Sequence, residues 1–160
     1  MFTLGGYDFK RFSRTNDTEI DILPYSKNDV HWTVGLPSMK VDSRIQPLSC
    51  QTAILDTGTS HIRIPADDFD LIKALLADYS QSTCSVSEQG NLECDCGLRG
   101  QPSNFPVIKF NFTSSKGKID YELTPDDYVT KLGLTCYMKF NRLNKRVDSN
   151  QNGGEDSIKG

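Results

Sequence analysis

The sequence predicts a mainly β fold with one or two short helices. Several stretches alternate apolar and polar residues with the two-residue period of a β-strand, whereas only one stretch has a clear helical period. With 160 residues, the chain is long enough for one domain with a buried core. A single β-rich domain is therefore expected, and its elements can be assigned in order along the chain.

The strands expected in the first part of the chain precede a conspicuous aspartate, Asp56. In the second of them, Val30, Trp32 and Val34 fall on one side. The stretches with a strand pattern are 19–25, 30–36, 39–45 and a segment that ends at Asp56.

A β-hairpin is expected later in the chain, between residues 107–112 and residues 118–123. Both stretches alternate apolar with polar residues, so each strand has one apolar face. Gly117 lies between them and favours a tight turn.

The clear helix follows Pro65, over residues 66–79. Its apolar residues recur at helical spacing, and Asp67 and Asp68 fall in the first turn, where the helix dipole favours anions. A short helical turn is expected within TPDDYV (124–129), because a threonine cap, a proline and an acidic residue stand at capping-box spacing there.

The composition excludes several classes of protein. The chain has 18 basic and 21 acidic residues, a net charge of −3, without the basic stripe of a nucleic-acid-binding protein. No apolar run is long enough to span a bilayer. Because residues 1–12 lack the apolar core of a secretion signal, either the protein is cytosolic or the given sequence begins downstream of the true start.

Five cysteines favour the second alternative, in an oxidising compartment. Without CxxC pairs or a histidine near Cys94 and Cys96, disulfides are expected rather than a metal site. The odd count implies a partner thiol outside the chain or one cysteine that stays reduced. Glycosylation sequons at Asn16 and Asn111 agree with a secreted glycoprotein.

Asp56 is the main candidate for chemistry. An aspartate that follows a strand and precedes a glycine is most often a turn residue that bonds its own backbone. Here, however, Leu55 and Ile62 flank the turn, so the loop is expected to dip into the core. A buried carboxylate requires hydrogen-bond donors, and residues 57–60, Thr-Gly-Thr-Ser, supply them at close range.

The run from Ala53 to Ser60 resembles the second active-site loop of the pepsin-like aspartic endopeptidases. Weaker similarities follow in the family's order, from residue 1 to about residue 140: they lie at 2–8, 30–43, 64–72 and 105–140. The resemblance implies one lobe of a bilobal, pepsin-like β-barrel fold. Residues 1–143 would form the C-terminal lobe, without the N-terminal lobe and the last strands, and residues 144–160 would be a loop or disordered tail.

The resemblance also implies a mechanism that needs no cofactor and no metal. Two aspartates, one from each lobe, share a proton and activate a water molecule that attacks the peptide carbonyl. Asp56 would be the catalytic residue of this lobe. Thr57 would bond to the facing loop, the Gly58 N–H and Thr59 would bond to the carboxylate, and Ile54 and Ser60 would line the substrate groove.

Two departures from the family pattern have consequences. The sequence contains no second Asp-Thr-Gly or Asp-Ser-Gly, so the isolated chain is expected to be inactive. The family's later hydrophobic-hydrophobic-Gly-Asp strand is replaced by residues 153–160, GGEDSIKG, so Ile54 and Leu55 are expected to be under-packed. His31 and His61 are expected to be exposed rather than catalytic.

The resemblance also implies how the cysteines pair in disulfides. Cys136 lies where the family has the second member of a disulfide; its mate would be Cys94 or Cys96, with Cys96 favoured. Cys84 would then pair with Cys94, and Cys50 would remain a thiol.

The favoured function is thus an aspartic endopeptidase lobe, secreted or lysosomal/vacuolar, whose partners are the missing N-terminal lobe and a peptide or protein substrate. Two alternatives stay open: a one-loop protease that is active as a homodimer, and a non-catalytic peptide- or protein-binding relative on the same fold.

Overall fold

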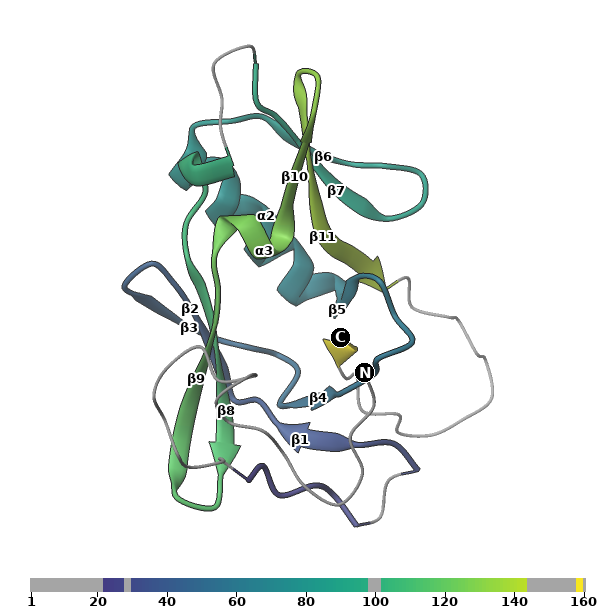
Figure 1. Cartoon of the computed structure of the whole chain (residues 1–160), viewed down its shortest axis with the longest axis vertical. Coiled ribbons are helices and arrows are strands. Elements are labelled where there is room, and N and C mark those ends of the chain that lie inside the picture. The colour runs from purple at the N-terminus through teal and green to yellow at the C-terminus, as the bar shows by residue number, and fades with distance from the viewer. Residues whose placement is uncertain (1–21, 28–29, 98–101, 144–157, 160) are drawn as a thin grey trace, which may run out of the picture.

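The computed structural model describes residues 22–27, 30–97, 102–143 and 158–159, which form two β-sheets and two α-helices (Figure 1). The larger sheet has eight strands, with β10 (Val129–Leu132) paired to β11 and the others in the spatial order β1 (Thr33–Gly35), β4 (Thr52–Ile54), β12 (Ile158–Lys159), β5 (Ile62–Pro65), β11 (Thr135–Leu143), β7 (Asn91–Asp95) and β6 (Cys84–Val86). The expected mainly β fold is confirmed.

The smaller sheet is built from two hairpins, in the order β3 (Arg44–Pro47), β2 (Ser38–Val41), β8 (Ile108–Ser114) and β9 (Gly117–Leu123). The β8–β9 hairpin is the one expected from the alternating pattern, and Gly117 has a φ of 123°, which disfavours residues with side chains. Asp42, in the β2–β3 turn, also has a positive φ, of 55°, a conformation that aspartate tolerates better than most residues.

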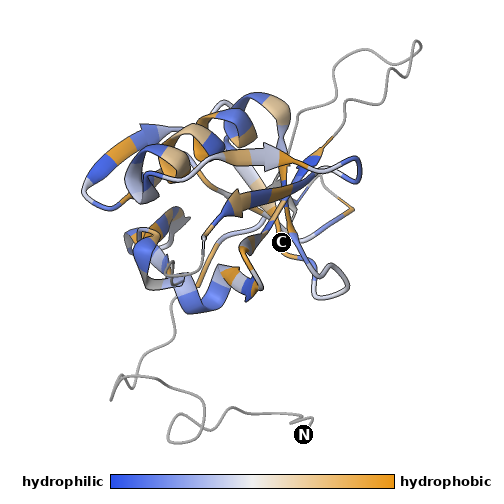
Figure 2. Ribbon diagram, turned by 90° about the horizontal axis from the view of Figure 1, so that it is seen from above, coloured by the Kyte–Doolittle hydropathy of each residue, from blue (hydrophilic) through white to orange (hydrophobic). Residues whose placement is uncertain are grey.

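Both expected helices are present. The long helix α2 (Ala66–Ser80) packs its apolar stripe of Phe69, Ile72 and Leu76 into the core, and Figure 2 shows polar and apolar residues alternating around it. The short helix α3 (Pro125–Tyr128) begins with the expected capping box, in which Asp127 Oδ2 accepts bonds from the backbone nitrogen (2.8 Å) and hydroxyl (2.7 Å) of Thr124. A 3-10 turn, η1 (Pro102–Asn104), lies near α3.

The expected strand at 19–25 is not found in its described part. Residues 19–21 lie outside the described residues, and within 22–25 only an isolated bridge joins Tyr25 to Val34. The next strand begins at Thr33, so Val30 and Trp32 are exposed instead of sharing the buried side with Val34. A period-two pattern does not reveal where pairing with a neighbouring strand begins.

The sequence suggested that residues 144–160 form a loop or disordered tail, but residues 158–159 form a strand. Ile158 and Lys159 form β12, which is parallel to β4 and antiparallel to β5. The expectation that the tail supplies no strand beside the Asp56 loop is therefore wrong. Its polar, glycine-containing composition hid a backbone pairing, which any residue other than proline can make. Residues 144–157 lie outside the described residues.

An apolar cavity of about 660 Å³ lies between the two sheets. Two of the residues that line it remain well exposed, Leu55 at 48% and Tyr121 at 60%, so the cavity is open. The full lining is Leu23, Leu36, Ala53, Ile54, Leu55, Ile62, Phe110, Phe112, Ile119, Tyr121 and Leu123. Ile54 and Leu55 thus border unfilled space, although Ile54 itself is only 8% exposed.

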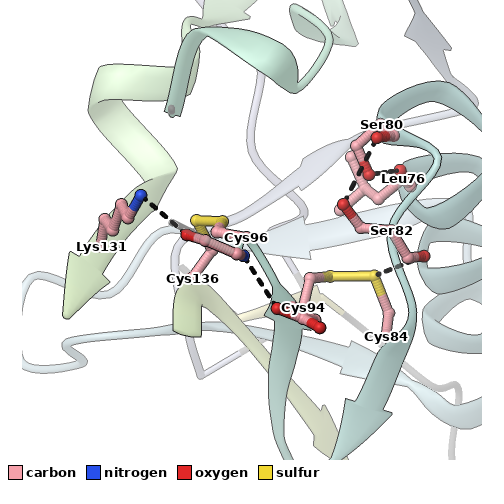
Figure 3. The surroundings of a disulfide bond; sticks show 10 residues. Leu76, Ser80, Ser82, Cys84, Cys94, Cys96, Lys131 and Cys136 are labelled. Atoms are coloured by element: carbon pink, nitrogen blue, oxygen red, sulfur yellow. Dashed lines mark hydrogen bonds between the residues drawn. A yellow bond between two sulfur atoms is a disulfide. The ribbon is translucent and has the colours of Figure 1, made fainter. Parts of the chain in front are cut away.

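Two disulfides join strands of the larger sheet (Figure 3). Cys84 and Cys94 are cross-strand neighbours on β6 and β7, and Cys96, just after β7, is bonded to Cys136 on β11. These are the two pairs that the family resemblance favours. Cys50 takes part in neither: it is buried, and its thiol lies 2.9 Å from the carbonyl oxygen of Thr52.

The asparagine of the sequon at Asn111 is buried in the smaller sheet. The Asn111 side chain is on β8, the residue is 7% exposed, and its amide nitrogen donates to Asp120 Oδ1 at 2.7 Å. Asn16 lies outside the described residues. No helix among the described residues is long and apolar enough to cross a membrane.

Candidate active site

The Asp56 loop connects β4 to β5 at one end of the larger sheet. β4 ends at Ile54, the backbone N–H of Leu55 donates to the carbonyl oxygen of Trp32 at 3.0 Å, and the chain turns at Thr57 and Gly58. The loop therefore leaves the sheet immediately before the aspartate, which follows from the change of sequence from apolar residues to the turn-forming Asp-Thr-Gly.

Each carboxylate oxygen of Asp56 accepts a hydrogen bond from the loop. The Gly58 N–H donates to Oδ1 at 2.9 Å, and the Thr59 hydroxyl donates to Oδ2 at 2.6 Å. These are the contacts that the family resemblance implies for Gly58 and Thr59. Bonds to both oxygens restrict rotation about the Cβ–Cγ bond and so fix the plane of the carboxylate.

Gly58 also permits a close approach that other residues would obstruct. A Cβ atom at this position would lie 3.2 Å from Asp56 Oδ1, closer than ordinary van der Waals contact. The glycine thus lets its own N–H and the carboxylate face one another without a side chain between them.

The depth of the loop differs from the expectation. Asp56, Thr57, Gly58 and Ser60 are exposed, and only Thr59 is partly buried. The loop does not dip into the core, because Leu55 borders the open cavity and no element of the described chain covers the turn. The carboxylate is therefore accessible from solvent.

The remaining predicted site residues are arranged around this turn. Ile54 lines the apolar cavity beside the loop, whereas the exposed Thr57 and Ser60 lie on either side of the Gly58–Thr59 pair. His31 and His61 are both exposed, as expected. Among the described residues, no three His, Cys, Asp or Glu side chains are grouped in a way that could hold a metal ion.

One residue outside the loop has contacts that the sequence did not indicate. Asp68, in the first turn of α2, is 3% exposed, and its carboxylate accepts bonds from the backbone nitrogens of Ser49 (2.7 Å) and Cys50 (3.1 Å). Sequence reasoning placed Asp68 only in the favourable field of the helix dipole. No local pattern signals the other role, because the partners are 18 and 19 residues away.

Comparisons with known proteins show what this chain is similar to. The model of the family described as "eukaryotic aspartyl protease" matches residues 1–158. Cathepsin E-A of Xenopus laevis is 27% identical over 131 residues, which cover 81% of this chain and 28% of the relative. The vacuolar aspartic protease of Candida albicans is 26% identical over 140 residues, which cover 88% of this chain and 29% of the relative.

A solved structure shows the same fold. The basic 7S globulin from soybean matches with a TM-score of 0.60 at 13% identity, over 87% of this chain and 35% of the globulin.

The chain spans less than a third of the length of the two curated relatives, cathepsin E-A and the vacuolar aspartic protease.

Proposed function

This chain belongs to the eukaryotic aspartyl proteases, and on that premise we propose that it is the C-terminal lobe of a pepsin-like aspartic endopeptidase. Asp56 would be one of the two catalytic carboxylates. One observation carries the proposal: the carboxylate is exposed, yet both of its oxygens are held by donors from its own loop. An exposed but oriented carboxylate is suited to meet a second one across an interface.

The chemistry requires two carboxylates in different protonation states. Two such groups at close range cannot both ionise easily, so the pair shares one proton. The ionised member removes a proton from a bound water as the water oxygen attacks the peptide carbonyl carbon, and the protonated member donates to the carbonyl oxygen. Asp56 alone cannot fill both roles, so the isolated chain would be inactive.

The substrate would be a peptide or protein in extended conformation beside the loop, with Ile54 and Ser60 on the groove wall. We further propose a secreted or lysosomal/vacuolar location. Two disulfides require an oxidising compartment, and one of the similar proteins is described as vacuolar.

Complementation tests this function directly. The chain is mixed with an N-terminal aspartyl protease lobe that carries the other Asp-Thr-Gly loop, and hydrolysis of casein is followed at acidic pH. We expect no cleavage by either lobe alone, pepstatin-sensitive cleavage by the mixture, and loss of cleavage with Asp56→Asn. Asp67→Asn, an exposed acidic residue on α2, is the matched control and should leave the activity unchanged.

Other outcomes would point to the alternative functions. Pepstatin-sensitive cleavage by the chain as a sedimenting monomer would refute the proposal. Activity that rises with a concentration-dependent dimer would identify a homodimeric protease. Peptide binding without cleavage, in a mixture whose lobes demonstrably associate, would identify a binding protein.

A further inference from the structure

Asp68 is an unusual residue because it is a charged side chain inside the core. The other buried polar residues in the described part of the chain, Thr33, Asn111 and Ser114, carry no charge. Burying a carboxylate is costly unless its oxygens are hydrogen-bonded, and here each oxygen accepts one backbone N–H. The position at the start of α2 adds the favourable field of the helix N-terminus. The side chain is thus well satisfied, and its partners belong to another part of the fold.

Those partners immediately precede β4. Ser49 and Cys50 are separated from Thr52, the first residue of β4, only by Gln51, whose carbonyl oxygen accepts a bond from the Leu36 N–H at 2.8 Å. Asp68 therefore fixes the start of the strand that ends just before Asp56.

The other strand of the loop is connected to the same helix turn covalently. β5 ends at Pro65, and α2 begins at Ala66 without an intervening loop. Asp68 consequently joins the far end of β4 to the far end of β5, and the two strands, the Asp56 loop and this link form a closed ring.

This link matters because β4 and β5 are not neighbours in the sheet. β12 lies between them, and it consists of two residues that pair with Ala53 and Ile54 on one side and with Arg63 on the other. Little of the sheet therefore sets the distance between the two strands, and a clamp at their far ends has a correspondingly larger effect.

We propose that Asp68 is a positioning residue for the catalytic loop: its buried carboxylate sets the spacing of β4 and β5 and thereby the orientation of Asp56. The inference rests on the proposed function for its catalytic consequence, but its structural part concerns this chain alone. Asp68 does not touch the reacting atoms; it acts through the backbone of Ser49 and Cys50.

The structural test uses Asp68→Asn. The asparagine has nearly the same shape, but its amide group has only one oxygen, so one backbone N–H would face an NH₂ group. We expect the NMR order parameters of Gly58 and Thr59 to fall from about 0.85 to below about 0.6, the range of a flexible backbone. Because the folded state gives its own resonances, partial unfolding of the variant does not mask the result.

Two control variants separate positioning from general effects. Asp67→Asn removes a charge from the same helix turn at an exposed position, and Leu76→Ala destabilises the core from the buried face of α2. Both should retain the order parameters of the wild-type loop. Unchanged order parameters in Asp68→Asn, equal losses in Leu76→Ala, or a loop that is already flexible in the wild-type chain would overturn the inference.

The kinetic test uses the complemented enzyme. We expect Asp68→Asn to lower kcat about tenfold and to change KM less than about twofold, since orientation of the carboxylate affects the chemical step more than substrate binding. A loss confined to KM would contradict the positioning role. If the wild-type lobes associate but the mixture is inactive, the proposed function fails, and the order parameters still decide whether Asp68 positions the loop.

Discussion

Asp56 is oriented by residues within three positions of itself in the sequence. The Gly58 N–H and the Thr59 hydroxyl each bond one carboxylate oxygen. Such a local arrangement holds its geometry on an exposed surface, where water competes for every donor. Orientation and accessibility are therefore compatible in this loop.

The Thr59 hydroxyl can be tested by substitution. Thr59→Val keeps the branched shape but removes the donor 2.6 Å from Asp56 Oδ2. A hydrogen bond to a charged group contributes about 1.5–3 kcal/mol, so we expect kcat of the complemented enzyme to fall about 10- to 100-fold. Thr59→Ser retains the hydroxyl and should retain most of the activity. Equal kcat values for the valine and serine variants would show that this hydroxyl has no part in orienting the carboxylate.

How well the contacts of a residue could be predicted from the sequence depends on how far along the chain its partners lie. The bonds to Asp56 could be anticipated because a short Asp-Thr-Gly-Thr turn leaves few alternatives for its donors. The bonds of Asp68 could not, since Ser49 and Cys50 come beside it only after α2 packs against the sheet. The expectation that Asp56 is buried was wrong, because flanking apolar residues do not reveal whether an element distant in the sequence covers a loop.

Among the elements, the β2–β8–β9 sheet has a polar cluster on one face. Lys40 on β2 donates to Asp120 Oδ2 at 2.6 Å, and Asn111 on β8 donates to Asp120 Oδ1 at 2.7 Å. The Lys40 bond, with a further contribution from Asn111, holds the pKa of Asp120 below its usual value. A carboxyl with a lowered pKa stabilises the folded state above the unfolded-state pKa of about 4 and loses that contribution as the pH falls through its folded pKa.

Lys40→Met should therefore have a pH-dependent effect on stability. Both partners are about one-third exposed, so we expect the free energy of unfolding at pH 7 to decrease by less than about 1 kcal/mol. As the pH falls from 7 towards 2 and the Asp120 carboxyl takes up its proton, the difference should shrink. Urea unfolding at the two pH values measures it. Lys73→Met, on α2, is the control; a Lys40→Met effect that is equally large at both pH values would exclude the ion pair as its cause.

The elements that the sequence predicted best have strong local signals. The β8–β9 hairpin combines alternation with a turn glycine, and α2 and α3 combine periodicity or capping with a preceding proline or threonine. The stretch 19–25 alternates equally well but lacks a paired strand in its described part. Alternation shows that a segment could have two faces, whereas a strand also needs a neighbour with which to pair.

For the whole molecule, the two disulfides differ in the length of chain that they close. Cys96–Cys136 spans 40 residues and Cys84–Cys94 spans 10. Loop-closure entropy assigns about 4 kcal/mol to the longer loop and about 3 kcal/mol to the shorter one. Replacing both cysteines of a pair by serine should therefore destabilise the chain more for the longer loop, as measured by urea unfolding of the two double variants. The opposite order would mean that packing around the sulfurs outweighs chain entropy.

The fold class of the molecule could be predicted from the sequence, but one strand of the larger sheet and the open cavity could not. An ordered series of short motifs indicated an aspartyl protease, and the family match and the fold agree with that family. The strand at 158–159 was missed because its pairing partners, β4 and β5, are about 100 residues earlier in the chain. The open cavity was foreseen only as poor packing of Ile54 and Leu55.

That cavity has a consequence for the life of the chain in a cell. An open cavity of about 660 Å³ lined by aliphatic and aromatic side chains promotes aggregation during biosynthesis and binding by chaperones. A chain released alone would be exposed to both for as long as the cavity stays uncovered. We therefore expect the chain, when it is produced on its own, to aggregate more readily than a protein without such a cavity.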